Sequence, residues 1–105
     1  MPALHEKANM NLSQLIKQKR RQVLEIAAGH GAQNVRLFGS VARGEATETS
    51  DLDLLIEMAP ERTLLDIVAI KQDLEELLGC KVDVVTEAAI SPYLRDKVLQ
   101  EAVRL

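Results

Sequence analysis

The chain has 105 residues, of which 47% are hydrophobic, and a net charge of −3, which predicts a single globular domain with a modest core. This charge gives no general attraction to nucleic acid or an anionic membrane, and two aromatic residues, Phe38 and Tyr93, are too few for a base-stacking platform. Cys80 is the only cysteine, which excludes an internal disulfide, and without a signal peptide or a membrane-length apolar stretch we expect a cytoplasmic protein with no membrane and no direct nucleic-acid partner.

Helices and strands are predicted to alternate along the chain. Residues 1–11 show no periodicity and are expected to form a flexible tail, which leaves residues 12–105 as the folded domain. Helical spacing and capping residues predict helices over residues 12–29, 41–43, 63–78 and 91–103. Short apolar runs predict strands over residues 34–38, 52–58 and 81–86. The predicted fold is α/β (α+β) in the order α-β-α-β-α-β-α, with a three-stranded sheet whose second and third strands are parallel because a helix joins them.

The first predicted helix carries four basic residues close together, Lys17, Lys19, Arg20 and Arg21. One interpretation is a solvated helix face. The other is a basic edge that attracts a polyphosphate or an acidic partner. The sequence leaves both open.

Two aspartates, Asp51 and Asp53, stand one residue apart at the head of the second predicted strand. Because side chains alternate along a strand, both point to one face while Leu52 and Leu54 point to the other. Two carboxylates at ~4 Å repel by on the order of 4 kcal/mol at an effective dielectric of about 20. Mg²⁺, which prefers hard oxygen ligands, reverses the sign of that interaction. Asp83 interrupts the apolar third strand and would stand beside the pair if the strand register agrees, so we predict that the same metal partners it.

A turn containing two glycines precedes these acids. The predicted strand over residues 34–38 is followed by Gly39. Ser40, which carries a hydroxyl, comes next and stands at the start of a short predicted helix. Gly39 allows a ligand to approach the backbone, and the helix N–H groups and the Ser40 hydroxyl can bind phosphate oxygens. Arg43 lies about one turn further on and can reach the same anion as a forked donor. The alternative is an ordinary strand-to-helix turn with Arg43 in a surface ion pair.

Two other kinds of phosphate site fit the sequence less well. The spacing of Gly39 and Gly44 matches a P-loop, but the Lys-Ser/Thr pair that follows in a P-loop is absent, so a P-loop ATPase is rejected. A phosphoacceptor domain also gathers acids around Mg²⁺. That fold begins with an apolar strand and an early acidic pair, whereas this chain begins with a basic helix and places the glycine turn before its acids.

The whole motif set resembles the signature G-S-x-x-R-G…S-D-x-D…D of the DNA polymerase β-like nucleotidyltransferases. In this chain it is spelled by Gly39-Ser40, Arg43-Gly44, Ser50-Asp51-Leu52-Asp53 and Asp83. The length and the D-L-D-L-L-I spelling resemble the minimal nucleotidyltransferases (MNT), the antitoxin partners of HEPN ribonuclease toxins. The motifs span residues 38–85. The resemblance implies a small mixed sheet whose first two strands are antiparallel.

The resemblance also implies a role for each motif residue. Asp51 and Asp53 bridge two Mg²⁺ ions, and Asp83 binds one of these ions and helps to activate the attacking hydroxyl. Gly39 and Ser40 hold the β- and γ-phosphates of ATP. Arg43 and Ser50 complete the nucleotide-binding set.

The activity implied is a nucleotidyltransferase of the EC 2.7.7 type. It transfers AMP from ATP to a tyrosine hydroxyl of a partner HEPN toxin and thereby silences the toxin. Because 105 residues leave no room for an acceptor-binding domain, the acceptor must be supplied by another molecule, and antibiotic nucleotidylation is disfavoured. The alternative is a non-catalytic antitoxin that neutralises its partner by binding alone.

Five further residues receive no catalytic role. His5 and His30 are expected to be exposed to solvent, and Cys80 is expected to be a small buried apolar residue. Tyr93 is expected to serve packing or partner contact rather than self-modification. Glu57 shares the face of Asp53 but lies about 13 Å along the strand at 3.3 Å per residue, too far to bind the same metal.

Overall fold

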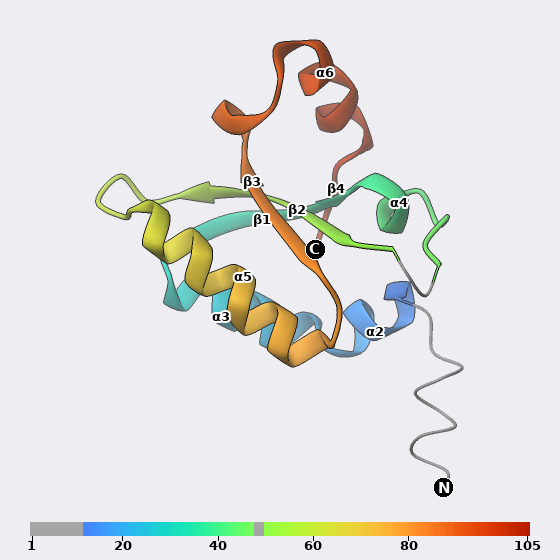
Figure 1. The fold of residues 1–105 in the computed structure, drawn as a ribbon, viewed down its shortest axis with the longest axis horizontal. Helices are drawn as coiled ribbons and strands as arrows, with labels where there is room; N and C mark the ends of the chain where they lie inside the picture. Colours follow the sequence, from blue (N-terminus) through green and yellow to red (C-terminus); the bar gives the residue numbers. More distant parts are fainter. Residues whose placement is uncertain (1–11, 48–49) are drawn as a thin grey trace, which may run out of the picture.

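The computed structural model describes residues 12–47 and 50–105, so the predicted tail over residues 1–11 and His5 lie outside the described residues. Its elements are α2 (Leu12–Gln18), α3 (Arg20–Gly29), β1 (Ala32–Phe38), α4 (Gly39–Ala42), β2 (Leu52–Met58), α5 (Leu64–Leu78), β3 (Val82–Thr86), the 3-10 turn η1 (Glu87–Ala89), α6 (Pro92–Glu101) and β4 (Val103–Arg104). Figure 1 shows α2, α3 and α5 on one side of the sheet and α6 on the opposite side.

The sheet is mixed and four-stranded, in the order β3-β2-β1-β4. β1 and β2 are antiparallel and β2 and β3 are parallel, which confirms both predicted relationships. The prediction of three strands is wrong, because residues 103 and 104 leave the helical pattern and pair with β1 as β4. The predicted helix over residues 91–103 therefore ends at Glu101, and Ala102 is already extended. Without β4, the outer edge of β1 would have unpaired N–H and carbonyl groups. Residues 103 and 104 form hydrogen bonds with some of these groups.

The core lies between the sheet and its helical layer. One face of β2 contributes three nearly inaccessible side chains, Leu52, Leu54 and Ile56, as the alternation predicts. They pack with Ile70 and Leu74 of α5 in one cluster of buried residues. β2 lies between β1 and β3, so this strand is paired along both of its edges.

A bulge in β1 sets which of its side chains face the core. Gln33 is opposite Glu57 and Arg36 is opposite Leu55, so β1 has one extra residue in this interval. Asn34 absorbs the extra residue with a φ of 50°. The strand consequently begins at Ala32, two residues before its predicted start.

The predicted helix over residues 12–29 is divided at Lys19 into α2 and α3. The backbone hydrogen bonds run on through the division, since the N–H of Lys19 donates to Leu15 and its carbonyl accepts from Val23. The division at Lys19 is therefore a local irregularity that does not end the helical layer. Ile16 of α2 and Val23 of α3 both remain buried.

The α5 crossover between the two parallel strands has well-defined ends. At its start, Thr63 and Asp66 form a reciprocal capping box, in which each side chain accepts a hydrogen bond from the other end of the first turn. At its end, Gly79 takes the left-handed conformation with a φ of 69°. This fixes where β3 begins, and hence which residue of β3 stands beside each residue of β2.

Helix α6 has no buried residue, and its first six residues, 92–97, are all exposed. A ten-residue helix in water is marginal by itself, so its ends must hold it. The last residue of the helix, Glu101, forms an ion pair with Arg43 at 3.2 Å. No helix in the described part of the chain has the length and apolar character needed to cross a bilayer.

Candidate functional site

The glycine turn forms where β1 ends. Gly39 has a φ of +74°, a conformation in which side chains other than glycine are strained, and it begins the short helix α4. The carbonyl of Gly39 accepts from the N–H of Arg43 at 3.1 Å, and that of Ser40 accepts from Glu45 at 2.9 Å. The helix begins two residues earlier than predicted. The first N–H groups of any helix lack acceptors within it, so this turn presents backbone donors.

Two of the predicted acids are brought together by strand register. Asp53 of β2 stands directly beside Asp83 of β3 in the parallel pair, on the face opposite the helical core. Asp51 lies just before β2 and is exposed, as is Asp83, whereas Asp53 is partly buried. Asp53 is also opposite Phe38, the residue that precedes the glycine turn. The register condition stated for Asp83 is therefore met.

The glycine turn and the acids are in direct contact. A β-carbon added to Gly39 would overlap the carboxylate of Asp53, so no other residue fits there without displacing the acid. The contact places the first residue of α4 beside the central acid. A ligand bound to the turn would therefore lie next to the carboxylates.

The electrostatic environment of Asp53 is unfavourable to its charge. Burial raises the pKa of Asp53, and the negative charges of Asp83 and Asp51 raise it further, while Arg43 acts in the opposite direction. Asp53 therefore lies within the electrostatic range of the other three charged groups. This group of acids would gain from a cation.

The side chains do not form a closed metal site as they stand. Within residues 12–47 and 50–105, no three His, Cys, Asp or Glu side chains are grouped closely enough to hold an ion. The donor set itself fits Mg²⁺, because all three groups are carboxylates, Asp53 and Asp83 share one face, and the negative charges of Asp83 and Asp51 both act on Asp53.

Arg43 adopts the arrangement that the sequence offered as the alternative. Its Nε donates to Glu45 at 3.1 Å and its Nη1 donates to Glu101 at 3.2 Å. Ser50, the residue directly before Asp51, is hydrogen-bonded to Thr47. Its hydroxyl accepts from the N–H of Thr47 at 2.8 Å, and its own N–H donates back to the Thr47 carbonyl at 3.1 Å.

One structural pair beside the acids was not singled out from the sequence. Lys71 donates to Glu75 at 2.9 Å and to the Val82 carbonyl at 2.7 Å, and Glu75 accepts from the Val82 N–H at 3.1 Å. The two side chains thus satisfy the backbone N–H and carbonyl of Val82, the residue immediately before Asp83. The signal available in the sequence was the spacing of four residues between opposite charges on one helix.

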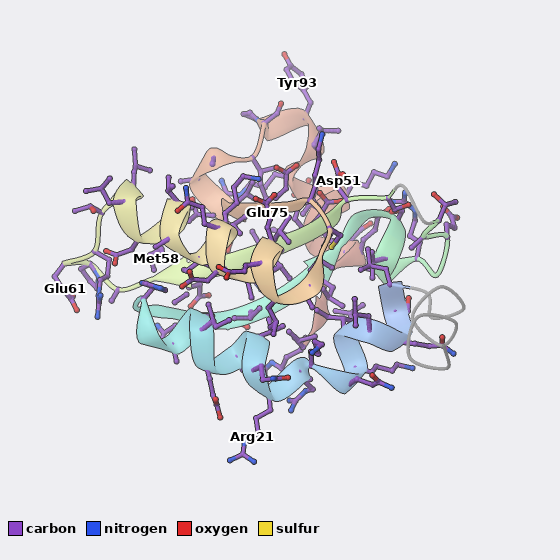
Figure 2. The ribbon with its side chains drawn as sticks, turned by 60° about the horizontal axis from the view of Figure 1, so that its bottom comes forward. Arg21, Asp51, Met58, Glu61, Glu75 and Tyr93 are labelled. Carbon is purple, nitrogen blue, oxygen red and sulfur yellow. The ribbon has the colours of Figure 1, made fainter. Side chains whose placement is uncertain are left out.

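Among the residues without a predicted role, His30 and Cys80 differ from expectation, whereas Tyr93 and Glu57 do not contradict theirs. His30 is not freely exposed, because its Nε2 lies 3.0 Å from Asp73 across two helices. Cys80 is only partly buried. Tyr93 is 96% exposed and does not pack within the described chain, and in Figure 2 it points away from the rest of the molecule. Glu57 accepts a hydrogen bond from Asn34 at 2.9 Å.

Comparison with known proteins places this architecture in a family. Residues 16–105 match the family model described as a nucleotidyltransferase domain. The chain belongs to the nucleotidyltransferase family. The resemblance drawn from the motifs is confirmed.

Relatives of this nucleotidyltransferase carry more specific names. A Methanocaldococcus jannaschii protein named "Putative protein adenylyltransferase" is 44% identical over 94 residues, which cover 90% of this chain and 97% of the relative. Protein adenylyltransferase MntA of Thermococcus cleftensis is 35% identical over 79 residues, which cover 75% of this chain and 80% of the relative.

Solved structures of similar fold include a "putative minimal nucleotidyltransferase" with a TM-score of 0.82 and 50% identity, covering 92% of this chain and 98% of that one. A mutant of the toxin–antitoxin pair MntA–HpeT gives a TM-score of 0.65 at 26% identity, over 85% of this chain and 70% of that one. The nucleotidyltransferase described here is thus similar in fold and in sequence to minimal members of its family.

Proposed function

We propose that this nucleotidyltransferase is an ATP-dependent protein adenylyltransferase that acts as an antitoxin. It transfers AMP to a tyrosine hydroxyl of a partner HEPN ribonuclease toxin and so silences it. The observation that carries the proposal is the position of Asp53, which stands beside Asp83 by strand register and against Gly39 of the phosphate turn.

The chain's own residues divide the work of the transfer. Gly39 and Ser40, with the backbone N–H groups of α4, hold the β- and γ-phosphates, and Ser50 supports the loop that leads into Asp51. When ATP binds, Arg43 leaves one of its carboxylate partners, Glu45 or Glu101, and binds a phosphate of the nucleotide instead. Asp51, Asp53 and Asp83 would hold two Mg²⁺ ions, which when bound supply charge neutralisation and a more acidic hydroxyl.

The reaction balances without a nucleophile from this chain. The tyrosine oxygen forms a bond to the α-phosphorus, the bond between that phosphorus and the bridging oxygen breaks, and pyrophosphate leaves. The hydroxyl proton passes toward Asp83 and then to solvent. The acceptor belongs to a second protein, which agrees with the toxin–antitoxin structure of similar fold.

A direct test uses the protein encoded beside this chain, expected to be a short helical protein with an R-x₄₋₆-H motif. That partner is incubated with ATP and Mg²⁺ and with wild type, Asp53→Asn or Asp96→Asn, and is then weighed by mass spectrometry. Asp96 is an exposed aspartate on α6 and serves as the matched control. We expect AMP on the partner with wild type and Asp96→Asn, and none with Asp53→Asn.

A second function is favoured by one observation, namely that no three acidic side chains form a ready metal group in the described residues. In that case the protein neutralises its partner by contact alone. An unmodified partner that is equally inhibited by wild type and Asp53→Asn would support this binding antitoxin and exclude the enzyme.

A further inference from the structure

Two arginines lie side by side on the face of the sheet that carries the acids. Arg36 of β1 is directly opposite Arg104 of β4 on one side and Leu55 of β2 on the other. Opposite residues in an antiparallel pair share a face, and Leu55 is two residues from Asp53, so Arg36 and Arg104 share the face of the acids. They lie two residues further along the strands than Asp53. At 3.3 Å per residue this is about 7 Å from the row of paired residues that contains Asp53.

The positive charges of this pair are not neutralised. Within residues 12–47 and 50–105, neither Arg36 nor Arg104 forms an ion pair with a side-chain carboxylate. Arg36 donates from Nε to the Asn34 carbonyl at 3.2 Å, and its Nη2 is buried without a hydrogen-bond partner. Like charges directly opposite each other destabilise a sheet, and an unpaired buried donor adds to that cost. An anion held between the two guanidinium groups would reverse both effects.

A hollow of about 560 Å³ adjoins Arg104 at this edge of the sheet. Arg20 and Arg104 line it with the polar residues Gln33 and Asn34 and with residues that pack in or against the core, Leu24 and Val35. Its one acidic lining residue, Glu57, already accepts a hydrogen bond from Asn34. The hollow leaves room for a segment of a partner protein beside Arg104, which is exposed.

The position of the arginines relative to the phosphate turn indicates which molecule brings the anion. Along β1 the order is Arg36, then Phe38 opposite Asp53, then Gly39 of the turn. The row of acids therefore lies between the turn and the arginines. In an in-line displacement the attacking oxygen enters opposite the leaving group. With pyrophosphate held at the turn, as in the proposed function on which this step rests, the acceptor enters from the side of Arg36 and Arg104.

We propose that Arg36 and Arg104 bind an acidic residue of the acceptor protein, close to the hydroxyl that receives the nucleotidyl group. The two arginines determine acceptor specificity and take no part in the bond-making step. Arg20 belongs to α3 on the other side of the sheet, where its Nε donates to the Leu105 carbonyl at 2.6 Å, so it is not part of this pair. A guanidinium can bind a carboxylate through two parallel hydrogen bonds, which selects for orientation as well as charge.

The test measures binding, so that it does not depend on transfer. Two fluorescein-labelled peptides carry a central tyrosine, flanked by glutamates in one and by glutamines in the other. Their affinity for the full chain is measured by fluorescence anisotropy with Mg²⁺ and a non-hydrolysable ATP analogue. We expect wild type to prefer the glutamate peptide by about tenfold, the effect of one hydrogen bond to a charged group.

Arg104 is the residue to change first, because it is exposed and its backbone pairing does not involve the side chain. Arg104→Gln should abolish the preference, and Arg104→Glu should transfer it to a lysine-flanked peptide. Arg21→Gln removes the same charge from an exposed helix position and should leave the preference unchanged. Circular dichroism of each variant verifies the fold.

Three results would overturn the assignment. If wild type binds the glutamate and glutamine peptides equally, the arginines do not recognise an acidic residue of the acceptor. An equal loss in Arg104→Gln and Arg21→Gln shows a general charge effect. A weaker affinity of Arg104→Gln for the ATP analogue itself shows that the anion is a nucleotide phosphate. Each of these is independent of whether AMP is transferred to the toxin.

Discussion

The α-carbon of Gly39 lies against the carboxylate of Asp53, with no room for a β-carbon between them. Two requirements therefore meet at Gly39. Its φ of +74° favours glycine on conformational grounds, and the neighbouring acid excludes a side chain on steric grounds. The chain offers a way to separate these two requirements, because Gly44 has a φ of +73° and no neighbour within 4 Å of an added β-carbon.

Gly39→Ala and Gly44→Ala should consequently differ. Both are expected to lose about 1–2 kcal/mol of unfolding free energy from the left-handed backbone. Gly39→Ala should lose more, and its adenylyl transfer should fall by about 100-fold or more, because the methyl group displaces Asp53. Urea unfolding and the partner-labelling assay measure the two quantities. Equal activities in the two variants would mean that the position of Asp53 against the turn has no part in catalysis.

Asp53→Asn should separate stability from activity. Because burial and two neighbouring carboxylates disfavour the charged form of Asp53, the neutral variant is expected to be at least as stable as wild type at neutral pH without metal. Adding Mg²⁺ should raise the melting temperature of wild type by a few degrees, roughly the effect of 1 kcal/mol, and that of the variant much less. Differential scanning fluorimetry with and without Mg²⁺ measures both. A variant that is unfolded without metal would show that Asp53 is a structural residue.

The Lys71–Glu75 pair should give the fold a defined pH dependence. The hydrogen bond between them lowers the pKa of Glu75 and raises the pKa of Lys71. A lowered acid pKa stabilises the fold above the pKa of the unfolded chain, about 4.3, and a raised lysine pKa stabilises it below about 10.4. Wild type should therefore exceed Glu75→Gln in stability between about pH 5 and pH 10, with the difference shrinking outside that range. Thermal melts across pH measure this, and Glu76→Gln, at the exposed next position, is the control.

Thr63→Ala should weaken the start of α5. The Thr63 hydroxyl accepts from the N–H of Leu65 at 3.2 Å, and Asp66 accepts from the N–H of Thr63 at 3.2 Å. Loss of an N-cap side chain costs about 1 kcal/mol, and Thr63→Ser should retain most of it. Equilibrium unfolding compares the three proteins. If the alanine and serine variants are equally destabilised, the hydroxyl is not what stabilises the helix start.

The sequence predicted β2, α5 and the parallel β2–β3 pair well because their signals are local and strong. β2 is an apolar run from Leu52 to Ile56 interrupted only by Asp53, and α5 has a capping residue at one end and glycine at the other. These elements also place the acids, so the side-by-side position of Asp53 and Asp83 followed from register alone. The contact between Gly39 and Asp53 was not predictable, because it depends on how far the turn bends toward β2.

The segments that were predicted poorly from the sequence are those whose structure depends on contacts with residues far away in the chain. Val103 and Arg104 are too few to show a strand period, and their pairing depends on a free edge of β1 more than sixty residues earlier. The bulge at Asn34 has no sequence mark and appears only when Ala32 and Val35 must both face the core. Likewise, the partnership of His30 with Asp73 links α3 to α5 across the fold, so nearby residues gave no sign of it.

Helix α6 contributes none of its ten residues to the interior, although only the short turn η1 separates it from the strand that carries Asp83. The fold therefore places almost no restriction on the sequence of this segment beyond its ends. Natural variation can accumulate there without disturbing the chemistry beneath it. A lineage of such proteins can in this way acquire a new recognition surface while inheriting the same reaction unchanged.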